Sequence, residues 1–324
     1  MFKFIFNFQA VLFILLMRLG FILLLLLCTR AYSQPTQHVA THSGRIEIIP
    51  LDQLNSPFDE DNLCLTANGR QLYFSTNRGG QIWSYSRRGP GGWYASDRDI
   101  WVSEKVKGQW QPPVPLPYGI NTSNSEDEPS TVKNGKVLYY QSWGLQWEQT
   151  QGPYYRVKRK GRKWKNLQGL GGPITRFFRL YSYTHGMCVS PDQRLLIVAA
   201  RKPSEAHFDV YMSRKGPFGW SRFTRLDIST AGNEQSVFLA ADGKTLYFAS
   251  DGYEGFGGLD IYKTVLSADG SFGAIINLGA PINSEQDDYG FVISKDGNEA
   301  YFVRQGDIYM LGLSRADPLI KPLQ

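Results

Sequence analysis

One pattern of apolar and polar positions occurs five times along the chain. In each copy a short apolar run is followed by a two-residue turn and a second apolar run, which predicts a β-hairpin. The turns are Asn68-Gly69, Asn134-Gly135, Asp192-Gln193, Asp242-Gly243 and Asp296-Gly297. Asn-Gly and Asp-Gly tolerate the positive φ angles of a tight hairpin, and only the turn with Gln193 fits this rule poorly.

Two further segments follow each hairpin. A third apolar run begins with an aspartate and has an aromatic residue two positions later, except in the second copy, which has only 153–157 (PYYRV); these aspartates are Asp99, Asp209, Asp260 and Asp307. A fourth segment begins with an aromatic residue and has a leucine six positions later: Trp110/Leu116, Trp164/Leu170, Trp220/Leu226 and Phe272/Leu278. Four-stranded units at intervals of 50 to 66 residues are typical of β-propeller blades.

The fifth copy lacks the fourth segment, and a matching segment lies near the N-terminus. In three copies an acid follows an isoleucine by six positions: Ile120/Glu126, Ile228/Glu234 and Ile282/Asp288. Leu54 precedes Glu60 by the same step. We therefore expect residues 45–56 (RIEIIPLDQLNS) to supply the last strand of the fifth blade and to close the ring.

The predicted fold is therefore all-β, a single β-propeller of four-stranded blades, five in number. A sixth blade would have to lie in the long insert 77–98. The predicted propeller spans residues 45–313, preceded by a flexible leader (34–44) and followed by a C-terminal tail (314–324).

Residues 1–33 differ in composition from the rest. They are almost entirely apolar, and the segment from Met17 has a positive start, a short apolar core and a small-residue cleavage pattern at Ala31-Tyr32-Ser33. This predicts a signal peptide, with a possible true start at Met17 and a mature chain from Gln34. An uncleaved membrane anchor is the alternative. Lipidation of Cys28 is disfavoured because Leu27 stands where such signals need a small residue.

The net charge of +6 comes partly from residues 156–165 (RVKRKGRKWK), which we interpret as a solvated outer hairpin rather than a binding site. Cys64 and Cys188 occupy the same repeat position in the first and third copies, which are not neighbours in a ring. We expect both to be small buried hydrophobes rather than a disulfide.

The motifs DGKTLYFASDGYEGFGGLDIYKT and NLGAPINSEQDDYGFVISKDGNEAYF resemble the WD40-like repeats of the TolB-type β-propeller family, in particular envelope proteins of the Bacteroidetes type. The resemblance covers residues 45–313. It implies a periplasmic or outer-membrane-associated binding module without catalytic residues. Such propellers often accompany OmpA-like peptidoglycan-binding domains, so the implied partners are envelope proteins, OmpA-like proteins or secretion-machinery components among them.

Acidic residues stand at one repeat position, where the chain enters the innermost strand: Glu60, Glu126, Glu234 and Asp288, with Thr184 in the third copy. They are followed by Asp61, Asp127, Gln235, Tyr289 and His185. Four carboxylates at one channel mouth could bind a cation or a basic peptide. The alternative, which we favour, is that each acid accepts backbone hydrogen bonds in its own blade. Catalysis by these acids, as in a glycoside hydrolase, is disfavoured because repeat-equivalent acids lack distinct environments.

Aromatic residues in the loops between second and third strands are the predicted contact residues. They are Trp83, Tyr85 and Trp93 in the first copy and Trp143 and Trp147 in the second. Loops on a rigid scaffold often carry binding, and Trp and Tyr dominate interface energetics. The alternative is that these side chains fold back over their own blades.

The function expected from the sequence is non-catalytic binding of envelope proteins, without a cofactor, a metal or nucleic acid. The alternative is a propeller that binds or hydrolyses a polysaccharide, with glycan or peptidoglycan as ligand. The four histidines show no ligand spacing for zinc.

Overall fold

The computed structural model describes residues 37–40, 46–78, 87–88, 94–95, 98–144 and 146–312. The expected signal peptide, the start at Met17 and the C-terminal tail lie outside these residues. In the part of the chain that is described, no helix has the length and apolar character needed to cross a membrane.

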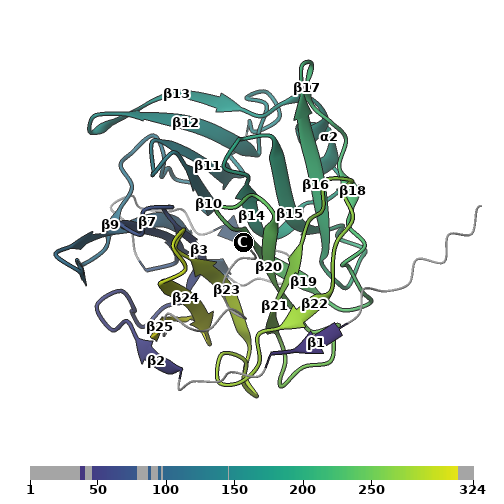
Figure 1. The fold of residues 1–324 in the computed structure, drawn as a ribbon. Helices are drawn as coiled ribbons and strands as arrows, with labels where there is room; N and C mark the ends of the chain where they lie inside the picture. Colours follow the sequence, from purple (N-terminus) through teal and green to yellow (C-terminus); the bar gives the residue numbers. More distant parts are fainter. Residues whose placement is uncertain are drawn as a thin grey trace, which may run out of the picture. The chain divides into compact units, whose positions relative to one another are not determined.

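Five antiparallel sheets are arranged around a common centre (Figure 1). The innermost strand of each sheet contacts the innermost strands of its two neighbours, in the cyclic order β3, β10, β14, β19, β23 and back to β3. This closed order of contacts makes the chain a five-bladed β-propeller, as the repeat predicted.

The first three blades are each built from consecutive strands. Blade one contains β3 (Glu60–Leu65), β4 (Gln71–Thr76), β7 (Asp99–Val106), β8 (Gln109–Trp110) and β9 (Val114–Pro115). Blade two contains β10 (Glu126–Val132), β11 (Val137–Ser142), β12 (Tyr154–Lys160) and β13 (Lys163–Gly169). Blade three contains β14 (Tyr183–Val189), β15 (Leu195–Arg201), β16 (Asp209–Gly216), β17 (Gly219–Trp220) and β18 (Thr224–Arg225). A short helix, α2 (Gly172–Phe178), connects blades two and three.

The last two blades each include a strand from the N-terminal part of the chain. Blade four contains β19 (Glu234–Leu239), β20 (Thr245–Ser250), β21 (Asp260–Val265), β22 (Ile275–Asn277) and β1 (Gln37–Val39). Blade five contains β23 (Asp288–Ile293), β24 (Glu299–Arg304), β25 (Asp307–Gly312) and β2 (Glu47–Pro50). In the insert of blade one, β5 (Arg87–Arg88) and β6 (Tyr94–Ala95) form only a two-stranded ribbon, so the insert supplies no sixth four-stranded blade from its described residues.

The predicted closure of the ring is confirmed. β2 pairs antiparallel with β25, with Glu47 opposite Gly312 and Pro50 opposite Tyr309. Beyond β2, the Leu51 N–H donates to the Ile308 carbonyl at 3.0 Å, as the Leu116 N–H does to Ile100 in blade one. The N-terminal segment thus completes blade five with the bonds that the fourth segment makes elsewhere.

The predicted flexible leader is wrong in one part. Gln37, His38 and Val39 pair in parallel with β22 and add a fifth strand to blade four. The edge of β22 offers backbone groups for pairing, and an extended segment from the N-terminal part of the chain satisfies them. The sequence carries no signal for this pairing, because Val39 is more than half exposed and has no apolar pattern around it.

Apolar side chains between neighbouring blades form the core of the described propeller. Each of five clusters combines residues of two adjacent blades. Between blades one and two, for example, Tyr73, Ile100, Leu138 and Tyr140 are at most 2% exposed. Burying such a side chain contributes about 1.5–3 kcal/mol, so the ring is held together mainly at these interfaces.

Candidate functional site

The four repeat-equivalent acids (Glu60, Glu126, Glu234 and Asp288, here the blade acids) are completely buried. Each accepts bonds from both the backbone N–H and the hydroxyl of the residue four positions earlier. In chain order these hydroxyl residues are Ser56, Thr122, Thr230 and Ser284. The acids therefore hold the connection between two blades in place at the start of each innermost strand.

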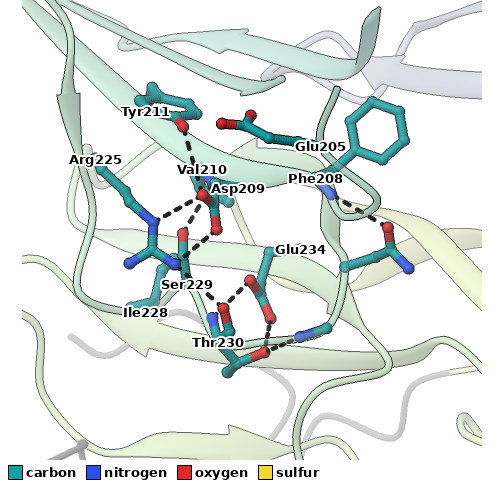
Figure 2. A network of polar contacts seen from close by, with 12 residues as sticks. Glu205, Phe208, Asp209, Val210, Tyr211, Arg225, Ile228, Ser229, Thr230 and Glu234 are labelled. Carbon is teal, nitrogen blue, oxygen red and sulfur yellow. Dashed lines mark hydrogen bonds and ion pairs between the residues drawn. The ribbon is translucent and has the colours of Figure 1, made fainter. Parts of the chain in front are cut away.

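The arrangement around Glu234 is representative (Figure 2). The Thr230 hydroxyl donates to Glu234 Oε1 at 2.6 Å, and the Ser250 hydroxyl donates to the same oxygen at 2.8 Å. Arg225 lies beside it, bonded through two nitrogens to Asp209 and through one to the Thr230 carbonyl. Burial raises the pKa of Glu234 to about 6, against the opposing effect of these donors.

A fixed cross-strand partner completes each of these sites. Glu60, Glu126 and Glu234 face Thr76, Ser142 and Ser250, whose hydroxyls donate to them. Blade five differs, since the shorter Asp288 faces Arg304, whose Nε donates to it at 2.6 Å. In blade three, Thr184 faces Ala200, so this blade has neither the buried acid nor its cross-strand hydrogen-bond donor.

Each blade acid accepts a backbone hydrogen bond, as the favoured interpretation expected, but the donor lies in the connection that precedes the blade. Carboxylates with no exposed surface and several hydrogen bonds cannot reach a sugar or a cation in the channel. A hydrolase that uses these four residues as acid and nucleophile has no support in this geometry.

All five innermost strands carry a β-bulge just after this position, where the pairing register shifts. The residue two positions after the blade acid has a positive φ angle of 50° to 114° in every blade: Asn62, Glu128, Gly186, Ser236 and Gly290. A bulge turns side chains out of the regular alternation. The side chains at the bulges therefore do not follow the alternating directions of the apolar side chains later in the same strands.

At the bulges four charged or titratable side chains come together: Asp61, Arg98, Asp127 and His185, here the mouth cluster. Arg98 lies 3.4 Å from Asp61 and 3.8 Å from Asp127, and His185 Nε2 lies 3.5 Å from Asp61. The cluster joins blades one, two and three, and the ring of Tyr289 from blade five lies 6.3 Å from that of His185.

The mouth cluster is only partly exposed. The side chains of Arg98 and His185 are 27% and 29% exposed. Burial lowers the pKa of Arg98, but the nearby Asp127 and Asp61 outweigh this effect and leave it raised, so Arg98 is charged. Among the described residues, His185 Nδ1 is buried without a hydrogen-bond partner. The cluster therefore offers polar atoms that a bound group can engage.

Sequence reasoning expected Asp61, Asp127, Gln235 and Tyr289 near this mouth but missed Arg98. The Arg98 carbonyl accepts the Glu126 N–H at 2.8 Å, which fixes Arg98 beside the start of β10. In blades three and four the equivalent carbonyls belong to Phe208 and Leu259. A charged residue just before the aspartate of the third strand was the signal that could have identified Arg98.

Sequence reasoning also missed Glu128. Glu128 occupies the bulge position of blade two and is 1% exposed. It accepts a hydrogen bond from the Tyr154 hydroxyl and one from the Gly186 N–H at 3.0 Å. Burial, followed by repulsion from Asp127, raises its pKa to about 7.

Two pockets lie along the innermost strands. A small one of about 10 Å³ lies at the bulges, lined by residues that include Asn62, Pro129, Gly186 and Gly290. Towards the hairpin turns of the blades lies a cavity of about 180 Å³, lined mainly by apolar side chains of all five innermost strands. No side chain of the mouth cluster lines this cavity.

Of the five predicted aromatic contact residues, the structure describes two. Trp83, Tyr85 and Trp93 lie outside the described residues. Trp143 and Trp147 are half-buried, packed on each other with ring centroids 5.1 Å apart and against the cluster between blades two and three. Trp143 also contacts Phe178 of α2, so the two tryptophans cover their own blade more than they project from it.

Cys64 and Cys188 are buried free thiols, as expected. Burial raises the pKa of both, that of Cys188 to about 12, so neither is a nucleophile at neutral pH. In the part of the chain that the structure describes, no group of three His, Cys, Asp or Glu side chains is placed to hold a metal ion. The basic stretch at 156–165 forms the β12–β13 hairpin at the outer edge of blade two.

No protein-family model and no curated protein matches the chain. Among solved structures it is similar to TolB from Acinetobacter baumannii, with 13% identity and a TM-score of 0.41 over 81% of this chain and 56% of TolB. It is also similar to a family 117 glycoside hydrolase from Zobellia galactanivorans, with 11% identity and a TM-score of 0.48 over 83% and 91% of the two chains.

A gluconolactonase from Xanthomonas campestris is similar at 13% identity and a TM-score of 0.45, over 87% of this chain and 96% of that one. This chain spans about half the length of TolB. The propeller is established by the strand pairing of the chain itself.

Proposed function

We propose that the protein is a non-catalytic binding protein of the cell envelope that holds a partner protein at the polar mouth of its channel. The carrying observation is the mouth cluster. Three blades bring these side chains together at a partly exposed position, with Arg98 within 4 Å of Asp61 and Asp127 and His185 within 4 Å of Asp61. The blade acids, which would be the catalytic candidates, are buried and fully engaged.

The chemistry of the mouth indicates a partner segment with both charged and polar side chains. Arg98 can bond a carboxylate or a backbone carbonyl, and Asp127 can bond a basic side chain. Tyr289 adds a half-buried ring beside them. A partner of this chemistry fits the expectation of an envelope protein, such as an OmpA-like protein or a secretion-machinery component.

Export of the chain is part of the proposal and rests on the pattern of residues 1–33. Cleavage after Ser33 would deliver the propeller to the periplasm or to the outer membrane. N-terminal sequencing of the protein from its native envelope should begin at Gln34. A first residue upstream of Gln34 would contradict cleavage there.

The binding proposal is tested by crosslinking the mature protein in its native envelope and identifying its partners by mass spectrometry. Arg98→Ala and His185→Ala should each lose a partner that the unchanged protein retains. Arg214→Ala is the matched control, because Arg214 is exposed on the hairpin side, away from the bulges. Thermal melting checks that each variant is folded. Equal capture by all variants, or no partner at all, would contradict the proposal.

Recognition of a polysaccharide is a second candidate function, favoured by one observation. A surface groove of about 530 Å³ is lined by aromatic and polar side chains of blade two and of the connection that precedes it, including Asn124, Gln146, Trp147 and Thr150. Aromatic rings beside amides and hydroxyls suit sugar rings. Trp147→Ala should then abolish retention on immobilised glycan while Arg98→Ala leaves it unchanged, and the reverse pattern would exclude the groove.

A further inference from the structure

The cavity near the hairpin turns has apolar side chains from every blade in its wall. Its volume is about 180 Å³, and its wall includes Leu65, Val132, Val189, Leu239 and Ile293, one from each innermost strand. An apolar cavity of roughly 150 Å³ in another protein stays dry and binds benzene. The space is therefore enough for a ring of that size or a short alkyl chain.

The opening of the same cavity carries positive charge. Lys133 and Lys295 lie on its lining, both in turns that leave them exposed to solvent. Among the described residues that line the cavity, none is an aspartate or a glutamate. The two ammonium groups are thus free of acidic partners within the lining, and their charge is available to a ligand.

The surrounding turns reinforce this charge. Lys136 lies in the same hairpin turn as Lys133, Lys244 follows the turn of blade four, and the β12–β13 hairpin adds further lysines and arginines. Aspartates of these turns, such as Asp192 and Asp296, are engaged by serine hydroxyls and backbone N–H groups of their own turns. A cleft lined by one sign of charge concentrates ligands of the opposite sign.

We propose that this cavity binds a small amphiphilic carboxylate, with its apolar body inside the channel and its carboxylate between Lys133 and Lys295. The apolar body has the size of a benzene ring or a short alkyl chain. This site is distinct from the mouth cluster, because none of the four mouth-cluster residues lines the cavity. Its occupancy does not depend on the function proposed for the mouth.

The test uses three probes that share one apolar body and differ in the head group: 3-phenylpropionate, 3-phenylpropan-1-ol and 3-phenylpropylamine. Isothermal titration of the mature protein should show saturable binding of the carboxylate, with a Kd on the order of 0.1–1 mM for a ligand of this size. The alcohol should bind more weakly, and the amine should not bind measurably.

Variants locate the site. Lys133→Gln and Lys295→Gln should each weaken carboxylate binding roughly twofold to fivefold, the range for a partly exposed ion pair. Lys215→Gln, which changes an exposed lysine of β16 outside the lining, is the matched control and should leave it unchanged. Ala241→Phe, at the half-exposed rim, should block all three probes. The lysine variants keep the test decisive if Ala241→Phe fails to fold.

Three results would overturn the proposal. Absence of saturable binding for every probe would show that the cavity is no ligand site. Equal affinity for the carboxylate and the alcohol, unaffected by the lysine variants, would show that the site does not recognise an anionic head group. Binding to vesicles of an anionic phospholipid without any binding of 3-phenylpropionate would show that this end of the propeller recognises a membrane surface instead.

Discussion

At the scale of single residues, one position performs one task in four blades with different side chains. Glu60, Glu126 and Glu234 each bind a hydroxyl four residues earlier and a hydroxyl across the hairpin. The sequence analysis found the acids from their spacing but not their partners. The partner four residues earlier was visible, since serine or threonine stands there in every copy that has the acid.

Replacing the pair Asp288 and Arg304 with the glutamate and serine found in blades two and four should largely preserve stability. Arg304→Ser alone leaves a buried carboxylate without its cation and should lower the free energy of unfolding by about 3–5 kcal/mol. Adding Asp288→Glu restores the longer acid that faces serine in blades two and four, so the double variant should recover more than half of the loss. Urea unfolding of the unchanged protein, of Arg304→Ser and of the double variant measures this. A double variant that is no more stable than Arg304→Ser would contradict the prediction.

Glu128 should make stability depend on pH. Its pKa is about 7 in the folded protein and lies near 4.5 when unperturbed. The folded state therefore holds this proton more tightly, and stability falls as pH rises from about 4.5 to 7. Glu128→Gln does not titrate and keeps an acceptor for the Gly186 N–H. Its free energy of unfolding relative to the unchanged protein should rise by about 2–3 kcal/mol between pH 5 and pH 8.

Chemical denaturation at the two pH values measures the effect of Glu128→Gln. Other titrating groups cancel in the comparison, because they are the same in both proteins. A difference between the two proteins that does not change with pH would show that Glu128 titrates normally.

At the scale of elements, an asparagine fastens the connection after a blade to its third strand. Asn121 exchanges two hydrogen bonds with the backbone of Ile100, and Asn283 does the same with Ile261. Asn55 makes the equivalent pair with Ile308, although 253 positions separate them in the chain. The N-terminal segment therefore makes the same side-chain and backbone hydrogen bonds to blade five that the fourth segments make in blades one and four.

Asn55→Ala should lower the free energy of unfolding by about 2–3 kcal/mol, because it leaves the N–H and the carbonyl of Ile308 without their side-chain partner. Asn298→Ala is the control, since Asn298 is exposed and bonds only within its own turn. The control should change stability by less than about 0.5 kcal/mol. Equal effects of the two substitutions would indicate that the fastening contributes nothing to closure.

At the scale of the whole propeller, the ring depends on one segment for its closure. Leu51 and Leu54, which follow β2, belong to the cluster between blades one and five. Each fully buried leucine contributes about 1.5–3 kcal/mol, in addition to the backbone pairing with β25. The loss of both is comparable to the total stability of many domains.

Deletion of residues 45–56 should therefore lower the melting temperature sharply or prevent folding. Deletion of residues 35–44 is the matched control, because it removes only β1, which pairs at the outer edge of blade four. The control should melt within a few degrees of the unchanged protein. Calorimetry of both deletions decides this, and an unchanged melting curve after loss of 45–56 would refute closure by β2.

The sequence by itself determined the architecture. Turn chemistry, alternation and the spacing of the acids and leucines recur from blade to blade, and a repeated unit must bury its faces against copies of itself. Tertiary structure alone decided the mouth cluster, Glu128 and the apolar cavity. These depend on which side chains the bulges of different blades turn towards one another, and on how far the ring closes around its channel. Neither can be read from the sequence, because the side chains that meet belong to different blades, as do Glu128 and Gly186, which lie 58 positions apart.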